Sequence, residues 1–519
     1  MRCASGSEFM TDHRLRLLHG TDDDVSAIAA RLDGTGIRVV LPEGQPAWSH
    51  QLVGLTLTDL LSRLFPRISV VVADDAVADA KLPPGPDRLK DRFMAARNRG
   101  GLPVNDADDP AILIRVGGTE GDASFFVDGD GWESYVGTVP SRLTLSTDSN
   151  VPTGPIAAAC RTAALVFDQV FRSGVRQAPE SVYSSLKTYE VSGKPLGHQD
   201  AVAVGLDAMQ VGAGSIGGAA IYSLARVPGV KGQLVVIDPQ DLEAHNHVRA
   251  LLVSQTDSAA QRPKLDLVGE ALGHHDGLDV VPHKASVTDY HASLPQDHVF
   301  PIVLSAVDSA PSRRAIQDCL PLVVVNAACH PHEVTVSGHV TGQGPCVCCL
   351  HMKDILDAKK VRMRMLAGAT GMNEPMVAEL LTAGAPLNLA HLRGIAKHRE
   401  LGEADLNHFE GKTLDDLWRE ELLYGAAAIS TDSGSAVAVA APFVTALAGT
   451  FLASELLKRS DSNLRDNALG PNGSFLRYVE NPYASPLFAD RSSPPRWEGS
   501  ECICRSTRRM RILTQRYGL

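Results

Sequence analysis

A glycine-rich turn between a short apolar run and a helix-forming segment constrains the fold of this chain most strongly. Residues 211–217 read Val-Gly-Ala-Gly-Ser-Ile-Gly and follow the apolar run Ala208–Val211. Glycines at such positions let the chain turn tightly and let amides at a helix N-terminus approach phosphate oxygens. We therefore predict a nucleotide-binding turn, formed by Gly212, Gly214 and Gly217, in a Rossmann-like sheet.

Apolar runs and helix-forming segments alternate on both sides of this turn. Before it we expect strands at 37–41, 68–73 and 111–116, a hairpin at 125–138, and helices at about 50–64, 87–98 and 155–171. After it we expect strands at 233–237, 279–283, 302–306 and 322–326, a hairpin near 333–340, and helices at 216–225 and 264–272. This alternation predicts an α/β fold with a parallel sheet.

A short repeat suggests that the first half is a degenerate sister of the second. Ser-Thr-Asp-Ser occurs at 146–149 and again at 430–433, each time before an alanine-rich segment that contains a proline. Coincidence between two alanine-rich helices is the alternative, and residues 173–195 read as a linker. We expect a cloning scar at 1–9, a degenerate α/β sister domain at 10–185, the domain of the glycine turn at 186–350, a helical insertion at 351–425, and the end of the glycine-turn domain with a cysteine-bearing tail at 426–519.

Charge and cysteine usage argue against several classes of protein. The net charge is −11 and no basic tract exceeds a few residues, so we expect no nucleic-acid partner. The uncharged run 433–454 contains Pro442 and many small residues, which favours a buried helix over a membrane span. Nine cysteines, several of them clustered, and the lack of a signal peptide favour a reduced, cytoplasmic protein.

Polar residues after the turn help to distinguish hydride transfer from adenylation by ATP. Asp238 ends the next strand, where an acid accepts hydrogen bonds from ribose hydroxyls. Hydride transfer needs no added cations, but attack of a carboxylate on the α-phosphorus of ATP does, and Arg249 and Lys264 would supply them. Asp308 follows the strand 302–306, where a carboxylate can hold Mg²⁺. The alternatives are surface charges at Arg249 and Lys264 and a helix cap at Asp308.

In order and spacing, these residues resemble those of the ubiquitin-activating-enzyme superfamily, with its bacterial ThiF, MoeB and HesA branch. Asn246 and Arg249 lie eight and eleven residues after Asp238, as in that family. The other matching segments are Pro263-Lys264, Val307-Asp308-Ser309 and the hairpin that ends at 346–349. The resemblance implies an adenylation domain in which Asn246, Arg249 and Lys264 manage the phosphates of ATP and Asp308 positions Mg²⁺. The chain departs from the family pattern at Gln240, Ala250 and Ser309.

Two cysteine pairs predict a metal site. Cys346 and Cys349 form a Cys-x-x-Cys pair, and Cys502 and Cys504 form a Cys-x-Cys pair near the C-terminus. Four thiolates suit a closed structural zinc site, which would tie the C-terminal tail to the hairpin. Because the family usually has two Cys-x-x-Cys pairs, Cys348 or His351 could replace one ligand.

Two further predictions concern groups outside the nucleotide turn. Residues 431–435 contain no cysteine, where family members that pass their product to a thiol usually carry one. We therefore expect adenylation without an obligatory enzyme thioester, with Cys329 as the rival nucleophile. The segment around Arg14 and Arg16 is similar to the one from which related enzymes supply a second arginine to the triphosphate. A solvated N-terminal arm is the alternative for both residues.

Together these features favour an ATP- and Mg²⁺-dependent adenylyltransferase with a structural zinc. Its substrate would be the C-terminal carboxylate of a small ubiquitin-like or sulfur-carrier protein or of a ribosomal peptide. The two halves would pair as a pseudo-dimer within one chain, or the chain would form a homodimer; the first half could also be a peptide-docking or dimerisation module. An NAD(P)-dependent oxidoreductase and a non-catalytic scaffold that binds a carrier protein are the other classes.

Overall fold

The protein divides into two compact units. The larger unit comprises Asp23–Leu350 and Ala440–Leu519, and the described residues of the smaller one lie within His351–Val439. The computed structural model describes residues 25–103, 105–107, 109–118, 120–171, 179–330, 333–398, 406–417, 440–470, 476–483, 488–498 and 502–518.

The glycine turn belongs to an eight-stranded sheet in the larger unit. Its strand order is β10-β9-β8-β11-β12-β13-β14-β15. The strands are β8 (Gly205–Val211), β9 (Lys231–Ile237), β10 (Gly277–His283), β11 (Ile302–Ser305), β12 (Val323–His330), β13 (Glu333–Val340), β14 (Arg477–Asn481) and β15 (Phe488–Ser492). Pairing is parallel from β10 to β12 and antiparallel from β12 to β15. The apolar strands β11 and β12 lie at its centre, as expected for parallel strands covered on both faces.

Helices join the parallel strands of this sheet. They are α6 (Ser215–Leu224), α7 (Gln255–Ala259), α8 (Lys264–Leu272), α9 (Val287–Ser293) and α10 (Ala310–Asp318). A long buried helix, α15 (Pro442–Ser460), packs against α6, β12 and β13. The predicted Rossmann-like α/β fold is therefore confirmed.

The first half forms a second sheet of seven strands in the order β2-β1-β3-β4-β5-β6-β7. The strands are β1 (Gly36–Val40), β2 (Arg67–Val71), β3 (Ile112–Val116), β4 (Phe125–Asp130), β5 (Glu133–Gly137), β6 (Ser181–Ser185) and β7 (Val191–Ser192). The helices are α2 (Val25–Gly34), α3 (Trp48–Ser62), α4 (Leu89–Asn98) and α5 (Thr153–Phe171). Pairing changes from parallel to antiparallel between β4 and β5.

The two sheets share one topology. If β10 is set aside, β8, β9 and β11 take the places of β1, β2 and β3, and β12–β15 follow in the order of β4–β7. Pairing becomes antiparallel at the same place in both sheets. The 19-residue helices α5 and α15 follow β5 and β13 respectively. The first half is therefore an α/β sister of the second, although one copy of the repeat that suggested this, residues 430–433, lies outside the described ranges.

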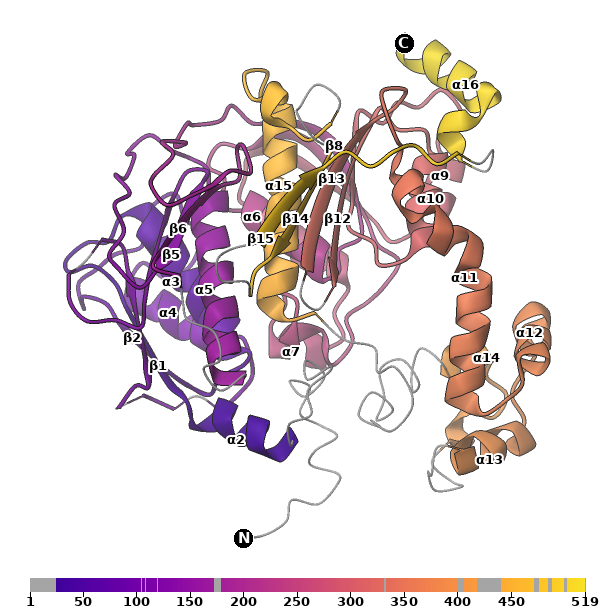
Figure 1. Ribbon diagram of the computed structural model, residues 1–519, viewed down its shortest axis with the longest axis horizontal. Coiled ribbons are helices and arrows are strands. Elements are labelled where there is room, and N and C mark those ends of the chain that lie inside the picture. Colours follow the sequence, from indigo (N-terminus) through magenta and orange to yellow (C-terminus); the bar gives the residue numbers. More distant parts are fainter. Residues whose placement is uncertain are drawn as a thin grey trace. The chain divides into compact units, whose positions relative to one another are not determined.

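The two halves meet at α5 and α15, which stand side by side between the sheets (Figure 1). Helix α5 packs on β4 and β5, and α15 packs on β12 and β13. Arg161 of α5 forms a bidentate ion pair with Glu480 of β14, with both N–O distances at 2.7 Å. The hydroxyl of Tyr478 donates to the same carboxylate at 2.7 Å. Both charged side chains are buried, so each depends on the other for its charge partner.

The prediction of a linker over 173–195 is wrong. Strand β6 pairs antiparallel with β5, and β7 pairs with β6, so the first sheet continues to Ser192. Residues 181–185 read Ser-Val-Tyr-Ser-Ser, a serine-rich segment without a long apolar run. The segment is a strand because β5 supplies its hydrogen-bond partners and because its side chains are mostly buried.

The smaller unit is a helical assembly with its own core. Its helices are α11 (Val347–Thr370), which begins at the end of the larger unit, α12 (Glu374–Ala383), α13 (Leu389–His398) and α14 (Leu414–Leu417). Apolar side chains from several helices, among them Leu366, Val377, Leu392 and Leu417, pack together. Among the described helices of both units, none combines the length and apolar character needed to cross a bilayer.

The ion pair between the halves gives a stability prediction. Arg161→Ala should lower the free energy of unfolding by about 3–5 kcal/mol, because it leaves the buried Glu480 carboxylate without its charge partner. Denaturant titration measures this loss. Lys90→Ala breaks an exposed ion pair with Asp74 and should leave the midpoint unchanged. The idea is wrong if the two variants lose equal stability. The apolar pair Arg161→Met with Glu480→Leu should recover most of the loss.

Candidate functional site

The glycine turn follows β8 and leads into α6. Gly212 has a φ of +97°, and a Cβ there would lie 2.6 Å from the carbonyl oxygen of Ala306. A Cβ at Gly217 would lie 2.0 Å from the carbonyl oxygen of Gly212. Only glycine fits either position. Gly214 differs, because it is the N-cap of α6 and faces open space. Because Gly214 has no side chain to cap the helix, the first N–H groups of α6 can donate hydrogen bonds to an anion instead.

Asp238 contacts the glycine turn directly. It follows β9, and its side chain is buried. One carboxylate oxygen accepts the N–H of Ala213 at 2.7 Å, and the other accepts the N–H of Gln240 at 2.9 Å. The acid that ends the second strand is therefore held against the turn that follows the first strand.

Lys264 lies beside Asp238 at the start of α8. Its ammonium group donates to Oε1 of Gln240 at 2.7 Å and lies 4.0 Å from Oδ1 of Asp238. The lysine is buried. Gln240 replaces an acid of the family pattern, so the lysine has one carboxylate and one neutral amide beside it rather than two carboxylates. More of its positive charge is therefore left for a bound anion.

Asn246 and Arg249 lie on one short segment after β9. Asn246 begins the 3₁₀-helix η2 (Asn246–Val248), and its Oδ1 accepts the N–H of Glu243 at 3.2 Å. Arg249 follows η2, with its side chain half-buried. Thr445 of α15 donates its hydroxyl to the carbonyl oxygen of Arg249 at 2.7 Å. The backbone of Arg249 is thus fixed by the buried helix that joins the two halves.

Asp308 lies at the strand end next to the glycine turn. Strand β11 pairs parallel with β8, and the N–H of Ala306 donates to the carbonyl oxygen of Val211 at 2.9 Å. Asp308 follows two residues later and is exposed. The alternative role as a helix cap falls to its neighbour Ser309, whose side chain accepts the N–H of Ser312.

A buried arginine that the sequence did not indicate supports this strand end. Arg313 of α10 donates to the carbonyl oxygen of Val307 at 2.8 Å and to Oδ1 of Asn326 at 3.1 Å. It therefore holds the residue before Asp308 against β12. Nothing in the local sequence distinguishes Arg313 from an ordinary surface arginine of a helix, because its contacts depend on the placement of the loop after β11 and of Asn326 on β12.

Cys329, the rival nucleophile, lies near the end of β12 within the electrostatic reach of Arg249 and Arg313. Burial raises the pKa of its thiol to about 11, although both arginines act to lower it. A thiol with this pKa is almost wholly protonated at neutral pH and is a poor nucleophile.

The structure thus brings together most of the residues predicted for the nucleotide site. Gly212, Gly214 and Gly217 form the turn, Asp238 contacts it directly, and Lys264 lies beside Asp238. Asp308 occupies the neighbouring strand end, and Arg249 shares the surroundings of Cys329 with Arg313. The roles of these residues toward a ligand stay predictions. Arg14 and Arg16 lie outside the described residues.

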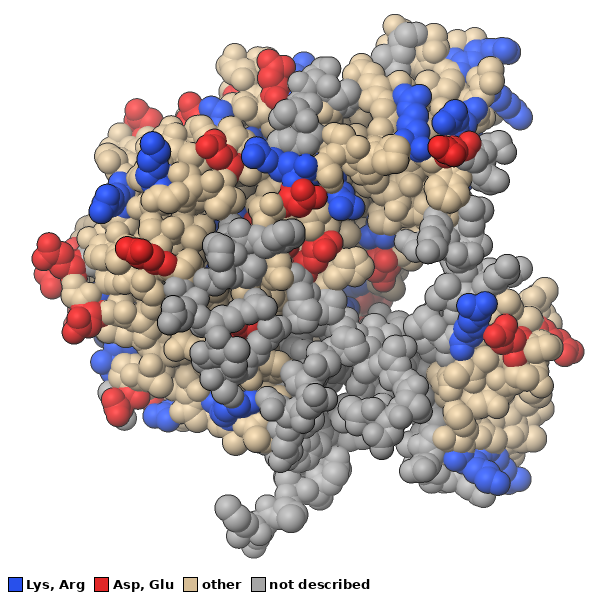
Figure 2. Space-filling model, in the orientation of Figure 1, with Lys and Arg blue, Asp and Glu red and all other residues tan. Residues whose placement is uncertain are grey.

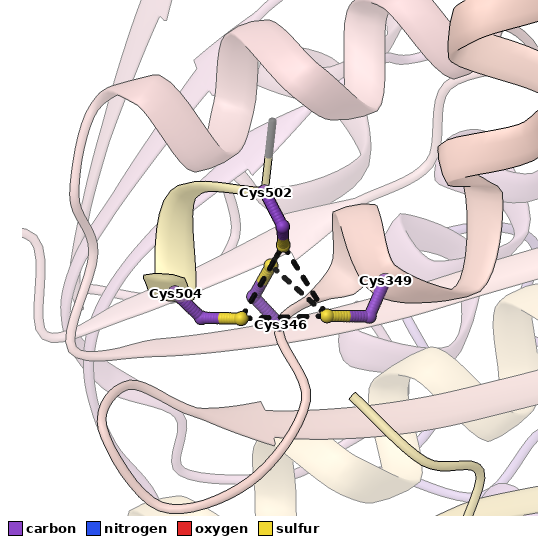
Figure 3. A group of neighbouring side chains, drawn as sticks. All are labelled: Cys346, Cys349, Cys502 and Cys504. Atoms are coloured by element: carbon purple, nitrogen blue, oxygen red, sulfur yellow. Dashed lines mark hydrogen bonds between the residues drawn. The ribbon is translucent and has the colours of Figure 1, made fainter. Parts of the chain in front are cut away.

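Four cysteines from two distant parts of the chain converge (Figure 3). The sulfurs of Cys346, Cys349, Cys502 and Cys504 all lie within 4.8 Å of one another. The sulfur–sulfur contacts run from 3.3 to 3.8 Å, too long for a disulfide. Four thiolates around one zinc ion, with Zn–S near 2.3 Å, would be about 3.8 Å apart. The donor set therefore fits a tetrahedral metal, and the buried Cys348 is not among the four.

Arginines hold the tail that carries the second cysteine pair. After Cys504 the chain forms α16 (Thr507–Tyr517), where basic side chains gather (Figure 2). Arg509 pairs with Asp318 at the end of α10 at 2.8 Å, and Arg516 donates to the carbonyl oxygen of Cys319 at 3.0 Å. These contacts attach α16 to the end of α10 and do not require a metal.

Comparisons with known proteins identify a matching family and a similar protein. The ThiF family model matches residues 206–483. Uncharacterized protein y4jF of Sinorhizobium fredii (strain NBRC 101917 / NGR234) is 28% identical over 440 residues, which are 80% of this chain and 81% of that protein.

Solved structures of E. coli MccB are also similar. The one with AMPCPP and selenomethionine MccA is 14% identical, with a TM-score of 0.31, over 56% of this chain and 65% of its own. The one with ATP is 13% identical, with a TM-score of 0.32, over 58% and 66%. Each match spans less than two thirds of the MccB chain. The family match runs from β8 to β14 and covers more than half of the sequence, so this chain belongs to the ThiF family.

Proposed function

We propose that this protein is an ATP- and Mg²⁺-dependent adenylyltransferase of the ThiF type. It activates a carboxylate as an acyl-adenylate and releases pyrophosphate. The substrate class we infer is the C-terminal carboxylate of a small ubiquitin-like or sulfur-carrier protein or of a ribosomal peptide.

The observation that carries this proposal is the position of Asp238. Its carboxylate contacts the glycine turn at Ala213 and lies 4.0 Å from the ammonium group of Lys264. A group suited to ribose hydroxyls, a turn suited to phosphate and a buried cation therefore meet at one point. A nucleotide whose ribose is bound by Asp238 would extend its phosphates past Gly214 toward Lys264 and Arg249.

The reaction needs orientation and charge stabilisation rather than a strong nucleophile. A carboxylate oxygen of the substrate attacks the α-phosphorus, and the bond from that phosphorus to the oxygen bridging to the β-phosphorus breaks. The electron pair leaves with pyrophosphate. Arg249 and Lys264 stabilise charge that grows on the phosphoryl oxygens, so they favour the transition state over the ground state. Binding orients the weak nucleophile in line with the phosphorus.

Two metals fit the side chains that would hold them. Asp308 offers exposed carboxylate oxygens at the strand end beside the turn, and oxygen donors are those that Mg²⁺ prefers. Mg²⁺ bound there would withdraw charge from the phosphate oxygens. The four cysteines fit Zn²⁺ in a structural site without an open position.

In the sister half, the described connection between β1 and α3 lacks the glycine turn. After β1 the chain reads Leu-Pro-Glu-Gly-Gln-Pro-Ala over 41–47, without the glycine spacing of 212–217. Helix α3 begins with the buried Trp48, where α6 begins with Ser215. We therefore propose one active site in each chain, with the first half in a supporting role.

Nucleotide binding and exchange test the proposal. Lys264→Ala should weaken ATP binding about tenfold, because it removes positive charge complementary to the phosphates. Asp308→Asn should slow exchange of labelled pyrophosphate into ATP about 10²-fold, because it removes the carboxylate that would hold Mg²⁺ beside those phosphates. Exchange should require a peptide with a free C-terminus and should vanish when that terminus is amidated.

Lys284→Ala is the matched control, because Lys284 pairs with Asp241 in an exposed ion pair. Its ATP affinity should equal that of the unaltered protein. Binding of NAD(P) in preference to ATP would favour an oxidoreductase instead, and failure to bind any nucleotide would favour a non-catalytic scaffold.

Zinc content tests the metal assignment. The purified protein should contain about one zinc ion per chain, and Cys504→Ser should remove most of it and lower the melting temperature, because metal binding is coupled to folding. Elemental analysis measures the metal. Cys329→Ala should keep its zinc, since this thiol lies on β12 and is not one of the four clustered cysteines. If the unaltered protein lacks zinc after purification without chelators, the assignment is wrong.

Substitution of Arg14 and Arg16 tests whether the N-terminal segment supplies a second arginine to the triphosphate. If Arg14 or Arg16 reaches the triphosphate, alanine at both positions should slow pyrophosphate exchange roughly tenfold or more, and thermal stability should stay the same. Arg38→Ala in the same half serves as a control for a general loss of positive charge. Unchanged exchange in the double variant would remove both residues from the proposed mechanism.

A further inference from the structure

We propose that Arg63 of the first half is a positioning residue for Arg249 of the second half. The inference rests on the proposed function, in which Arg249 contacts the phosphates of ATP. Through Arg63, the sister half holds in place the backbone that presents Arg249 to the nucleotide.

Arg63 lies directly after α3 and reaches into the second half. Its guanidinium donates to the carbonyl oxygens of Ala250 and Val253, each at 3.0 Å, and of Leu251 at 3.1 Å. It also donates to the carbonyl oxygen of His247. Its side chain is 1% exposed. One buried cation thus serves four carbonyls on both sides of Arg249.

A second arginine completes this contact. Arg99 follows α4 and donates to the carbonyl oxygen of Leu252 at 2.6 Å. Its own carbonyl oxygen accepts the N–H of Gln255 at 3.1 Å. Asp59 lies between the two arginines: it accepts Nε of Arg63 at 2.9 Å, and its other oxygen is 3.0 Å from Nε of Arg99. The carboxylate fixes both guanidinium groups in orientation.

These contacts matter because residues 247–253 have little regular structure of their own. Apart from η2, the segment forms neither helix nor strand, so its carbonyl groups need donors from elsewhere. The first half supplies those donors on one side. On the other side, Thr445 donates to the carbonyl oxygen of Arg249. The backbone around Arg249 is therefore held by hydrogen bonds from the first half on one side and from α15 on the other.

Loss of the Arg63 guanidinium would remove hydrogen bonds that hold this segment on the side of the first half. The carbonyls of His247 and Val253 would lose this donor, while that of Ala250 would keep the N–H of Val253 and that of Leu251 would keep Arg99. The segment would then move to bring the released carbonyls to water or other donors. A shift of about 1 Å in a group that contacts the reacting atoms can cost about 10²-fold in rate. Arg63 touches no part of the glycine turn in the described structure, so its effect on a nucleotide passes through the segment that carries Arg249.

The test compares binding of ATP and AMP, each with Mg²⁺, by calorimetry on the full-length protein. Arg63→Lys keeps the charge but loses the planar fork, and we expect it to weaken ATP binding about tenfold while AMP affinity stays unchanged. In the Arg249→Ala background the same substitution should have little further effect, because the residue through which it acts is gone. Amides of 247–255 should exchange with deuterium faster in Arg63→Lys.

Arg97→Lys is the matched control. Arg97 is a buried arginine of the same half whose partner, Asp106, also lies in that half. It should leave ATP affinity and the exchange of 247–255 unchanged. Equal losses of ATP and AMP affinity in Arg63→Lys, or a full additional loss in the Arg249→Ala background, would indicate a merely structural role and overturn the inference.

Failure of the proposed function has a different signature. If the unaltered protein binds no ATP, the adenylyltransferase proposal fails, and deuterium exchange of 247–255 alone then decides whether Arg63 positions the segment. Faster exchange supports positioning, and unchanged exchange contradicts it. If Arg63→Lys does not fold, Arg99→Lys takes its place in both measurements, because Arg99 holds the same segment.

Discussion

Glu480 and Asp59 are buried carboxylates whose arginine partners join the two halves of the larger unit. Glu480 of the second half is paired with Arg161 of the first, and Asp59 orients Arg63 and Arg99 toward carbonyls of the second. A buried carboxylate is tolerated only with its partners in good geometry, so these contacts admit one relative placement of the two sheets. Apolar packing of α5 on α15 supplies contact area without comparable directionality.

Under the proposed function, this arrangement gives the half without a glycine turn a supporting role. The second half contains the glycine turn, Asp238 and Lys264, yet its segment 247–253 also accepts hydrogen bonds from Arg63 and Arg99, which follow α3 and α4 of the first half. The site is therefore built from both halves even though the proposed ligand contacts among the described residues come from one. Gln240 tunes the charge locally, since an amide beside Lys264 leaves the ammonium group less neutralised than a second carboxylate would.

The sequence alone predicts those elements that are specified by residues close together in the chain. The glycine turn, the parallel strands and both cysteine pairs lie where the patterns indicated, with strand ends mostly shifted by a few residues. Strands β6 and β7 were missed because they are short and serine-rich and depend on β5 for pairing. Arg63 and Arg99 were missed for a related reason: each acts on carbonyl groups far away in the chain. Arg313 was missed because its contacts with Val307 and Asn326 depend on how β11 and β12 are placed, and no local pattern separates such arginines from solvated ones.

The shared topology of the two sheets also reveals where the chain tolerates elaboration. In the first half a short connection leads from the end of β5 at Gly137 to Thr153, where α5 begins. The corresponding connection in the second half, from Val340 to Pro442, carries the whole helical unit. The added unit has its own apolar core and leaves the strand order intact. The connection between β13 and α15 is thus an insertion site, at which a folded unit can be added or replaced without a change in the strand order of the sheet.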